Sequence, residues 1–360
     1  MDRLEKAIVC NLHSLPGLGS RSLYRIEEVF GSFRAFYQAD RGALYGSFID
    51  TGVIDAVLEQ RRVPPERLLE EYESHNIRIV CWNEPLYPKK LKYISNPPYV
   101  LYYRGDLEIT DQPCLAIVGS RVATLYGKTT AQKLAKELAA AGMVIVSGLA
   151  RGIDSEAHRG ALEAGRTIAV LGSGLDVIYP PENRRLYQDI MASGAIISEF
   201  PLHTAPEPHN FPLRNRIISG LSRGVLVIEA KEKSGALITA DFALEQGKDV
   251  FALPGPINSK TSAGPNNLIK QGAKLITGIE DILEEYYDIN RTQRKAEQGH
   301  LVWRDESEKQ ILALLEPDSR HFDEVLQATG LDIGRLSTLL LKLEMEGIIK
   351  SLPGNYYLRI

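Results

Sequence analysis

Short apolar segments alternate with longer amphipathic segments through the middle of the chain. After Pro113, the apolar runs are Leu115–Val118, Val144–Ser147, Ile168–Leu171, Ile196–Ser198, Val225–Ile228, Val250–Leu253 and Lys274–Ile276. Apolar residues fill consecutive rather than alternate positions in these runs, which is typical of parallel strands buried on both faces. Because helical segments separate the runs, the pattern predicts an α/β fold. We expect a Rossmann-like, doubly wound and mostly parallel sheet over residues 76–288.

Residues 1–75 carry a helical pattern, with a turn at Leu15–Gly19 between two helical segments. A Pro-Gly-x-Gly turn of this kind leaves backbone N–H groups free at a helix N-terminus, where a phosphate can bind. The same turn can serve packing alone, and the sequence does not separate the two functions. We predict an N-terminal helical domain of the helix-hairpin-helix or SAM-like type, and its contact with DNA stays open.

The C-terminal part follows a polar stretch at 289–304, which is typical of a linker. Over 305–360 the pattern predicts helices and strands at Ser307–Leu315, Phe322–Thr329, Ile333–Glu346, Gly347–Lys350 and Asn355–Leu358. Three helices and a β-hairpin are typical of a winged-helix domain. The third helix offers few side chains for base contacts, chiefly Arg335 and Lys342. We therefore favour protein interaction or weak DNA contact over sequence-specific binding.

Composition excludes several classes of protein. The 42 basic and 46 acidic residues give a net charge of -4, which provides no general attraction to polyanions. Three scattered cysteines, none in a CxxC pair, indicate reduced thiols rather than a disulfide framework. No segment has the length and apolar character of a signal peptide or a membrane helix. We expect a cytoplasmic protein that does not contact membranes.

The position of the basic residues changes the picture that the net charge gives. In a doubly wound sheet, ligands bind outside the carboxyl ends of the strands. The basic residues that follow the predicted strands are Arg121, Lys128, Arg151, Arg184, Arg185, Arg214, Arg216, Lys231 and Lys233. Several helix N-termini share this edge, so the arrangement predicts an anion site long enough for a row of phosphates. Phe211, close to Arg214, is a candidate for stacking on a base of single-stranded nucleic acid.

The candidate DNA-binding residues lie in these loops. They are Gly119, Ser120, Arg121, Lys128, Gly148, Arg151, Asn183, Arg184, Phe211, Arg214, Asn215, Arg216, Lys231, Ser234, Gly235 and Thr239. Some have a structural alternative: Arg214 or Arg216 can pair with Glu199 or Glu229, Phe211 can be a core residue, and the glycines can serve tight turns.

Asp154 and His158 are spaced like a metal-binding or catalytic pair. No third ligand follows nearby, so we interpret Asp154 as a helix cap and His158 either as a packing residue or as a residue that supports a site residue from behind. We predict no metal and no cofactor.

The order of the loops resembles the DNA-processing protein A family, also called DprA or Smf. The resemblance covers nearly the whole chain. It rests on Ile117–Arg121, Ser147–Asp154 with Ala157-His158, Gly174–Asp176 with Tyr179-Pro180, Phe211–Gly220, Ser234–Ala240 and Ala252–Gly255. Each stretch alone is weak evidence for the family, whereas all of them in this order are specific to it. The two terminal domains also resemble accessory domains of this family.

The resemblance implies a protein without catalytic activity that binds single-stranded DNA regardless of sequence. It further implies that the protein forms a homodimer, protects incoming DNA and loads the RecA recombinase during natural transformation. By position, Arg121 resembles the family's phosphate-binding arginine and Phe211 its base-stacking aromatic residue. The dimer face corresponds to Asn266–Leu275 with Ile269 at its centre, and Asp241 and Leu244 lie where the recombinase contact is expected.

Pro181 and Pro208 depart from the family, because some members carry lysines there; Arg184 or His209 is a candidate for compensation.

The main alternative is a Rossmann-like enzyme of nucleotide metabolism, similar to nucleoside-monophosphate phosphoribohydrolases. That group carries a PGGxGTxxE loop, and the corresponding stretch Lys233–Asp241 lacks both the double glycine and the glutamate. The hypothesis of a dinucleotide-dependent oxidoreductase has less support, since Gly119-Ser120-Arg121 does not match the GxGxxG motif of dinucleotide-binding sites. A sequence-specific transcription factor rests on the winged helix alone.

Overall fold

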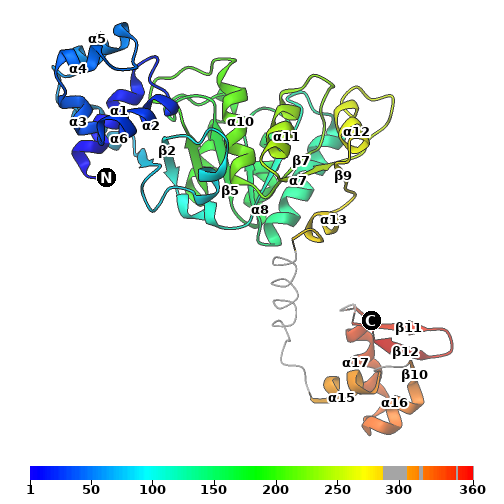
Figure 1. Ribbon diagram of the computed structural model, residues 1–360. Coiled ribbons are helices and arrows are strands. Elements are labelled where there is room, and N and C mark those ends of the chain that lie inside the picture. Colours follow the sequence, from blue (N-terminus) through cyan, green and yellow to red (C-terminus); the bar gives the residue numbers. More distant parts are fainter. Residues whose placement is uncertain (287–305, 316–318, 346–347, 360) are drawn as a thin grey trace. The chain divides into compact units, whose positions relative to one another are not determined.

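The computed structural model describes residues 1–286, 306–315, 319–345 and 348–359, and the chain forms two compact units, Met1–Asn290 and Arg291–Ile360 (Figure 1). The predicted linker at 289–304 lies outside the described residues. None of the helices in the described ranges is long and apolar enough to cross a membrane.

A nine-stranded sheet forms the centre of the first unit, with strand order β1-β2-β6-β5-β4-β3-β7-β8-β9. The strands are β1 Arg78–Cys81, β2 Val100–Gly105, β3 Cys114–Val118, β4 Val144–Ser147, β5 Thr167–Leu171, β6 Ala195–Ser198, β7 Gly224–Val227, β8 Asp249–Ala252 and β9 Lys274–Leu275. The pairs β1–β2 and β2–β6 are antiparallel, and all other neighbours are parallel. The predicted mostly parallel sheet is confirmed, and each of the seven predicted runs agrees with a strand to within one residue.

Successive residues of each central strand enter different apolar layers, which explains why the strands are apolar throughout. In β3, Ala116 and Val118 pack with α10 (Asn210–Leu221), α11 (Gly235–Glu245) and α12 (Ala263–Lys270). Leu115 and Ile117 pack on the other face with α7 (Leu125–Ala140), α8 (Ile153–Ala164) and α13 (Glu280–Leu283). Both faces are therefore covered, as a parallel sheet requires.

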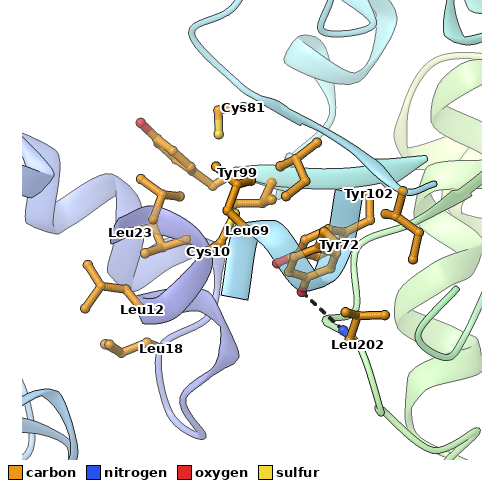
Figure 2. Close-up of a cluster of buried hydrophobic side chains, with 14 of the residues drawn as sticks. Cys10, Leu12, Leu18, Leu23, Leu69, Tyr72, Cys81, Tyr99, Tyr102 and Leu202 are labelled. Atoms are coloured by element: carbon orange, nitrogen blue, oxygen red, sulfur yellow. Dashed lines mark hydrogen bonds between the residues drawn. The ribbon is translucent and has the colours of Figure 1, made fainter. Parts of the chain in front are cut away.

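Six N-terminal helices share an apolar core with one side of the sheet. They are α1 Arg3–Ser14, α2 Ser20–Phe30, α3 Phe33–Gln38, α4 Arg41–Tyr45, α5 Thr51–Gln60 and α6 Glu66–Ser74. Their core is continuous with that of β5, β6 and α9 (Arg184–Ser193). In Figure 2, the ring of Tyr72 from α6 lies against Tyr102 of β2, with centroids 4.8 Å apart, and the Tyr72 hydroxyl accepts a hydrogen bond from the Leu202 N–H. The predicted boundary near residue 75 thus falls inside one compact unit.

The turn at Leu15–Gly19 joins α1 to α2, as predicted. Leu18 is buried, and the Ser20 hydroxyl oxygen at the start of α2 accepts a hydrogen bond of 2.9 Å from the Tyr99 N–H. These contacts attach the hairpin to the sheet domain. They favour the packing function of the turn over phosphate binding.

The second unit has the predicted three helices and β-hairpin: α15 Glu306–Leu314, α16 Phe322–Thr329, α17 Ile333–Met345, β11 Ile349–Leu352 and β12 Tyr356–Arg359. A short strand that was not predicted, β10 Arg320–His321, completes the sheet in the order β10-β12-β11. Ile311, Val325 and Leu340 belong to its core. Lys342, one of the two basic side chains expected on the outer face of α17, donates to buried Glu308 at 2.6 Å. This ion pair reduces further the capacity of α17 to contact bases.

His203 connects the N-terminal helices to the loop that precedes α10. Its Nε2 and Nδ1 atoms each lie 2.9 Å from a carboxylate oxygen, of Glu71 in α6 and of Asp176 respectively. Both ring nitrogens must carry a proton to donate to both carboxylates, so the arrangement favours the imidazolium. The hydrogen bond to Glu71 is the main cause of a raised His203 pKa.

We expect the stability contributed by His203 to depend on pH. A raised folded-state pKa gives stability that is complete below the ordinary histidine pKa of about 6.5 and is lost as the pH rises through the folded value. His203→Ala should therefore lower the thermal unfolding midpoint more at pH 6 than at pH 9, relative to the unsubstituted protein. Calorimetry at both pH values tests this. An equal loss at the two would show that His203 acts only through neutral contacts.

Candidate nucleic-acid interface

A pocket of about 440 Å³ lies where the direction of strand order reverses. After β3 the chain adds β4, β5 and β6 on one side, and then returns to add β7, β8 and β9 on the other. The carboxyl ends of β3 and β7 diverge at such a point and leave a crevice for a ligand. The pocket is lined by residues 118–122, at the end of β3 and in the loop after it, and by Lys231, Lys233–Ala236, Ile238 and Thr239 around the start of α11. The sequence predicted this location.

The loop between β3 and α7 is held from beneath by Glu229, which follows β7. The buried Glu229 carboxylate accepts hydrogen bonds from the Thr124 N–H at 2.9 Å and from the Thr124 hydroxyl at 2.6 Å. The Ser120 N–H donates to the Glu229 carbonyl oxygen at 2.6 Å. The Ser120 hydroxyl bonds within its own loop, to Val122. Ser120 therefore shapes the loop, and its hydroxyl is engaged rather than free to donate to a ligand.

Arg214 and Asp154 are two buried residues of opposite charge at the pocket. The Arg214 guanidinium donates to the carbonyl oxygens of Gly148, at 2.7 Å, and Val170. The Asp154 carboxylate accepts from the N–H groups of Gly148 at 3.1 Å and Ala150 at 3.4 Å. Burial lowers the pKa of Arg214 to about 10, although Asp154 opposes the shift, so Arg214 stays charged at neutral pH. It adds positive charge beneath the pocket.

The packing of Arg214 requires a glycine at position 148. A Cβ atom on Gly148 would lie 2.3 Å from the Arg214 guanidinium. Asp154 lies in the first turn of α8, after the N-cap residue Gly152, and its carboxylate closes the preceding loop. The interpretation of Asp154 as a helix cap is therefore wrong.

Phe211, at the start of α10, presents a half-buried ring at the pocket wall. The guanidinium carbon of exposed Arg121 lies 4.9 Å from the ring centroid, and that of Arg214 lies 5.9 Å away. Tyr179, from the loop after β5, lies 6.0 Å from Phe211 between ring centroids. The ring thus stands among cations, as a base-stacking residue of a nucleic-acid site does.

The opposite wall belongs to the loop after β7 and the start of α11. Lys231 and Gly235 are exposed there, and Ser234 is the N-cap of α11, with its side chain accepting from the Ala236 N–H. Thr239 is buried at the base of the wall. Asn215 joins the two walls, because its amide donates to the Gly235 carbonyl oxygen at 3.1 Å and accepts from Arg214. The pocket therefore combines exposed cations at the rim with buried, hydrogen-bonded polar side chains at its base.

The structure does not place two of the expected ligands at the pocket, because both side chains are buried and hydrogen-bonded inside the domain. The Arg216 guanidinium donates to both Glu199 oxygens, at 2.6 and 3.0 Å, inside the domain. Asn183 donates from its side-chain amide to the Leu149 carbonyl and to the Ser155 hydroxyl, each at 2.9 Å. The structural alternative was correct for Arg216, with Glu199 as its partner. Arg214 pairs with neither Glu199 nor Glu229.

Exposed cations surround the pocket beyond its lining. Lys128 lies in the first turn of α7, Arg184 begins α9, and Arg151 precedes α8. Arg151 forms an exposed ion pair with Glu182. Such surface pairs contribute little and can exchange partners. These three residues stay predicted phosphate contacts, as does the compensation of Pro181 and Pro208 by Arg184 or His209.

Comparison with known proteins identifies the family. Residues 78–287 match the family DNA recombination-mediator protein A, and residues 295–355 match the DprA winged helix domain. The chain belongs to the DNA recombination-mediator protein A family. It is 39% identical to protein Smf of Synechocystis sp. over 85% of this chain and 86% of that protein.

Two solved structures are similar as well. The X-ray structure of DNA processing protein A from Streptococcus pneumoniae gives a TM-score of 0.68 at 35% identity, over 79% of this chain and 98% of that one. The structure of DNA processing protein A from Helicobacter pylori is described for its unique single-stranded DNA binding mode. It gives a TM-score of 0.53 at 35% identity, over 61% of this chain and 97% of that one. The resemblance stated from the loop motifs is confirmed.

The segment expected at the dimer face contains the last part of α12, from Asn266, and the edge strand β9. Asn266 closes a loop, with its amide exchanging hydrogen bonds with the backbone of Gly255 at 2.9 and 3.2 Å. Ile269 is half-buried against the apolar layer that contains Leu268, and the Leu275 side chain is exposed. Asn266 thus has a structural function within one copy, while Ile269 and Leu275 leave apolar surface uncovered.

His158 is a packing residue, which is one of the two interpretations that the sequence left open. Its Nδ1 lies 2.7 Å from the Thr167 hydroxyl, which itself donates to the Ile145 carbonyl. Burial lowers the pKa of His158 to about 3, so the ring is neutral. Within the described residues, no group of three or more His, Cys, Asp or Glu side chains could hold a metal ion.

Sequence reasoning missed the supporting carboxylate of Glu229 and the neighbour Tyr179. Glu229 follows β7 as Glu199 follows β6, and an acidic residue directly after a buried strand must find a partner when it is buried. That rule indicates a structural function for both residues, and it does not identify the partner. The sequence singles out Tyr179 only within the Tyr179-Pro180 stretch that supports the family resemblance, and that stretch did not show that its ring lies beside Phe211.

Proposed function

We propose that this pocket and its basic rim bind single-stranded DNA without sequence preference. The observation that carries the proposal is the Phe211 ring at the pocket wall with the Arg121 guanidinium 4.9 Å from its centroid. An aromatic face accepts any base, and exposed cations bind the backbone, so neither element selects a sequence. The similarity to the H. pylori protein, whose structure is described for its single-stranded DNA binding mode, supports the same ligand.

The proposal includes protection of incoming DNA and loading of a RecA recombinase during natural transformation. Helix α11 supports this part of the proposal by its position. Its first residues line the pocket, and Asp241 and Leu244 further along the same helix are exposed. A recombinase bound at Asp241 and Leu244 would be adjacent to the strand held in the pocket.

We infer that the site has no catalytic activity. The two buried carboxylates at the pocket, Asp154 and Glu229, already accept hydrogen bonds from Gly148, Ala150 and Thr124. A general acid or base needs a carboxylate free to exchange a proton with substrate. Hydrolysis of a nucleoside monophosphate by the purified protein would favour the phosphoribohydrolase alternative instead.

Removal of the Arg121 side chain tests the proposed function. We expect Arg121→Ala to weaken binding of an unstructured oligonucleotide, and to reduce the salt slope by about 0.7 because one phosphate contact on a single strand is lost. Fluorescence anisotropy at several salt concentrations, with single- and double-stranded DNA, measures both effects. Arg62→Ala, which removes an exposed arginine of α5's C-terminal turn, is the matched control and should leave the slope unchanged. Equal slopes for Arg121→Ala and the unsubstituted protein would refute the phosphate contact.

The homodimer is part of the proposal, with α12 and β9 at its centre. An edge strand next to partly exposed Ile269 and Leu275 provides both unpaired backbone groups and apolar surface. We expect Ile269→Arg to give a monomer by light scattering, since an arginine there places an unpaired charge in the interface. Lys260→Arg serves as the control, because it keeps the charge and passes through the same preparation, and it should remain a dimer. A dimer for Ile269→Arg at micromolar concentration would exclude this face.

A further inference from the structure

Tyr179 is a partly exposed aromatic residue on a loop that is anchored at several points. The loop leaves β5 at Gly172 and ends in the short 3₁₀ helix η3 (Pro181–Asn183). The Ser173 hydroxyl donates to the Val177 carbonyl at 2.9 Å, and Asn183 fastens the far end to Leu149 and Ser155. The side chain of Tyr179 is nevertheless 38% exposed. The ring is thus held in place by its backbone while one part of it stays open to solvent.

Tyr179 lies beside Phe211, in a stretch of the chain that also carries exposed arginines. The two rings are neighbours, with centroids 6.0 Å apart and planes inclined by 43°. Exposed Arg184 and Arg185 follow Tyr179 along the chain, as exposed Lys231 and Lys233 stand on the far wall of the pocket. Arg151, in an exposed pair with Glu182, lies between β4 and α8 next to the same loop. A strand that leaves Phe211 toward β5 would therefore still meet cations.

We propose that Tyr179 is a second base-stacking residue, which extends the DNA site from the β3–β7 crevice across the end of β5. The inference rests on the proposed function and adds a direction and a minimum length to it. Bases on Phe211 and Tyr179 belong to neighbouring positions of one strand, and Arg184 and Arg185 bind the phosphates that follow. The site then accepts more than one nucleotide by stacking.

The spacing of the rings gives this site a preference for single strands. Successive nucleotides of one strand in B-DNA rise by about 3.4 Å. Rings 6.0 Å apart and inclined by 43° cannot follow a continuous base stack, so bases that occupy both must be separated from each other. Separating neighbouring base pairs of a duplex costs free energy at each step, because stacking is lost and the helix kinks. An unstructured strand separates its bases without that cost, so it should bind more tightly.

A length series of oligothymidylates tests the inference. Fluorescence anisotropy is measured for the full chain with labelled oligonucleotides that increase in length from the shortest that binds. Tyr179→Ala should leave the affinity for the shortest unchanged, because that oligonucleotide occupies Phe211 alone, and should weaken longer ones about tenfold. The salt slope should not change, because no cation is removed. Tyr179→Phe should retain the affinity, since it keeps the aromatic face.

The control is Tyr93→Ala, which removes a tyrosine that is 88% exposed and lies in the 3₁₀ helix η1 (Lys89–Tyr93). The neighbouring Leu91 and Ile94 lie beside Gly220, near the C-terminal end of α10, whereas Phe211 lies at the start of that helix. Tyr93→Ala should bind every length like the unsubstituted protein. Thermal unfolding of Tyr179→Ala is measured beside the binding, and Tyr179→Leu provides a second variant if the alanine variant does not fold.

Three outcomes overturn the inference, and they differ from one another. Equal weakening of all lengths by Tyr179→Ala would show that Tyr179 only positions Phe211. Unchanged affinity at all lengths, with weakened binding by Phe211→Ala, would leave the proposed function in place and remove Tyr179 from the site. Failure of the unsubstituted protein to bind any single strand would remove the proposed function itself.

Discussion

Glu199→Ala should lower the free energy of unfolding by about 3–5 kcal/mol, because it leaves the buried Arg216 guanidinium without its partner. Glu199 follows β6 and accepts two hydrogen bonds from Arg216 at 2.6 and 3.0 Å, with both side chains buried. Burial raises the pKa of Glu199, and the charge of Arg216 opposes that shift. Chemical denaturation monitored by circular dichroism measures the loss.

A matched control for this prediction is Glu182→Ala, which breaks the exposed pair with Arg151. Each variant removes the glutamate partner of one arginine, and the two ion pairs differ in that Glu199–Arg216 is buried and Glu182–Arg151 is exposed. The control should change stability little, because water already solvates both charges. A double variant, Glu199→Leu with Arg216→Met, should recover most of the stability, since an apolar pair of similar size needs no partner for a charge.

The same experiment decides whether Arg216 is a DNA ligand. If Arg216 bound phosphate, removal of Glu199 would release the guanidinium and strengthen binding to single-stranded DNA, with little loss of stability. We expect the opposite: a large loss of stability and no gain in affinity. A loss no larger than that of Glu182→Ala would contradict the structural function of the pair.

The sheet and the place of the site could be predicted from the sequence because each depends on a local pattern. Consecutive apolar residues separated by helical segments predict buried parallel strands, and the loops after β3 and β7 carry glycine, serine and basic residues in recognisable order. The winged-helix unit has equally regular helices. In each of these cases the residue pattern within one segment was enough to predict the element and the edge of the sheet where the site lies.

The partners of buried side chains could not be predicted, since they depend on contacts distant in sequence. Arg214 and Arg216 lie two residues apart on α10, and both are buried. One reaches the carbonyl oxygens of Gly148 and Val170, while the other reaches Glu199 after β6. Helical rotation points the two side chains in different directions. The sequence contained two acidic candidates and no means to choose between them.

The sequence also did not show that the N-terminal helices and the sheet form one compact unit, Met1–Asn290. A helical segment followed by a β-rich one predicts two domains, and a boundary near residue 75 follows from the change of pattern. In the structure, however, Tyr72 lies 4.8 Å from Tyr102 between ring centroids, and Ser20 is hydrogen-bonded to Tyr99. Apolar faces on both sides of the boundary bury each other. Amphipathic patterns show which face is buried, and they do not show against what.

Phe211→Ala should weaken binding of single-stranded DNA by about 1–3 kcal/mol, or about 5- to 150-fold, because one base loses its stacking surface. In the structure without DNA, the guanidinium of Arg121 lies 4.9 Å from the Phe211 ring centroid. A base that stacks on the ring takes the place of that guanidinium, which is then free to bind a phosphate. Phe211 and Arg121 thus act together, and the double variant should lose less than the sum of the single losses.

Conservative variants separate stacking from packing. Phe211→Trp keeps an aromatic face and should retain the affinity, whereas Phe211→Leu keeps an apolar side chain without that face and should bind like the alanine variant. Neither should change the salt slope, in contrast to Arg121→Ala, because no charge is removed. Anisotropy titrations with one unstructured oligonucleotide give all these values, and thermal unfolding shows whether each variant is folded. Full affinity for Phe211→Leu would mean that Phe211 only fills the pocket wall, and the base-stacking function would then have to lie elsewhere.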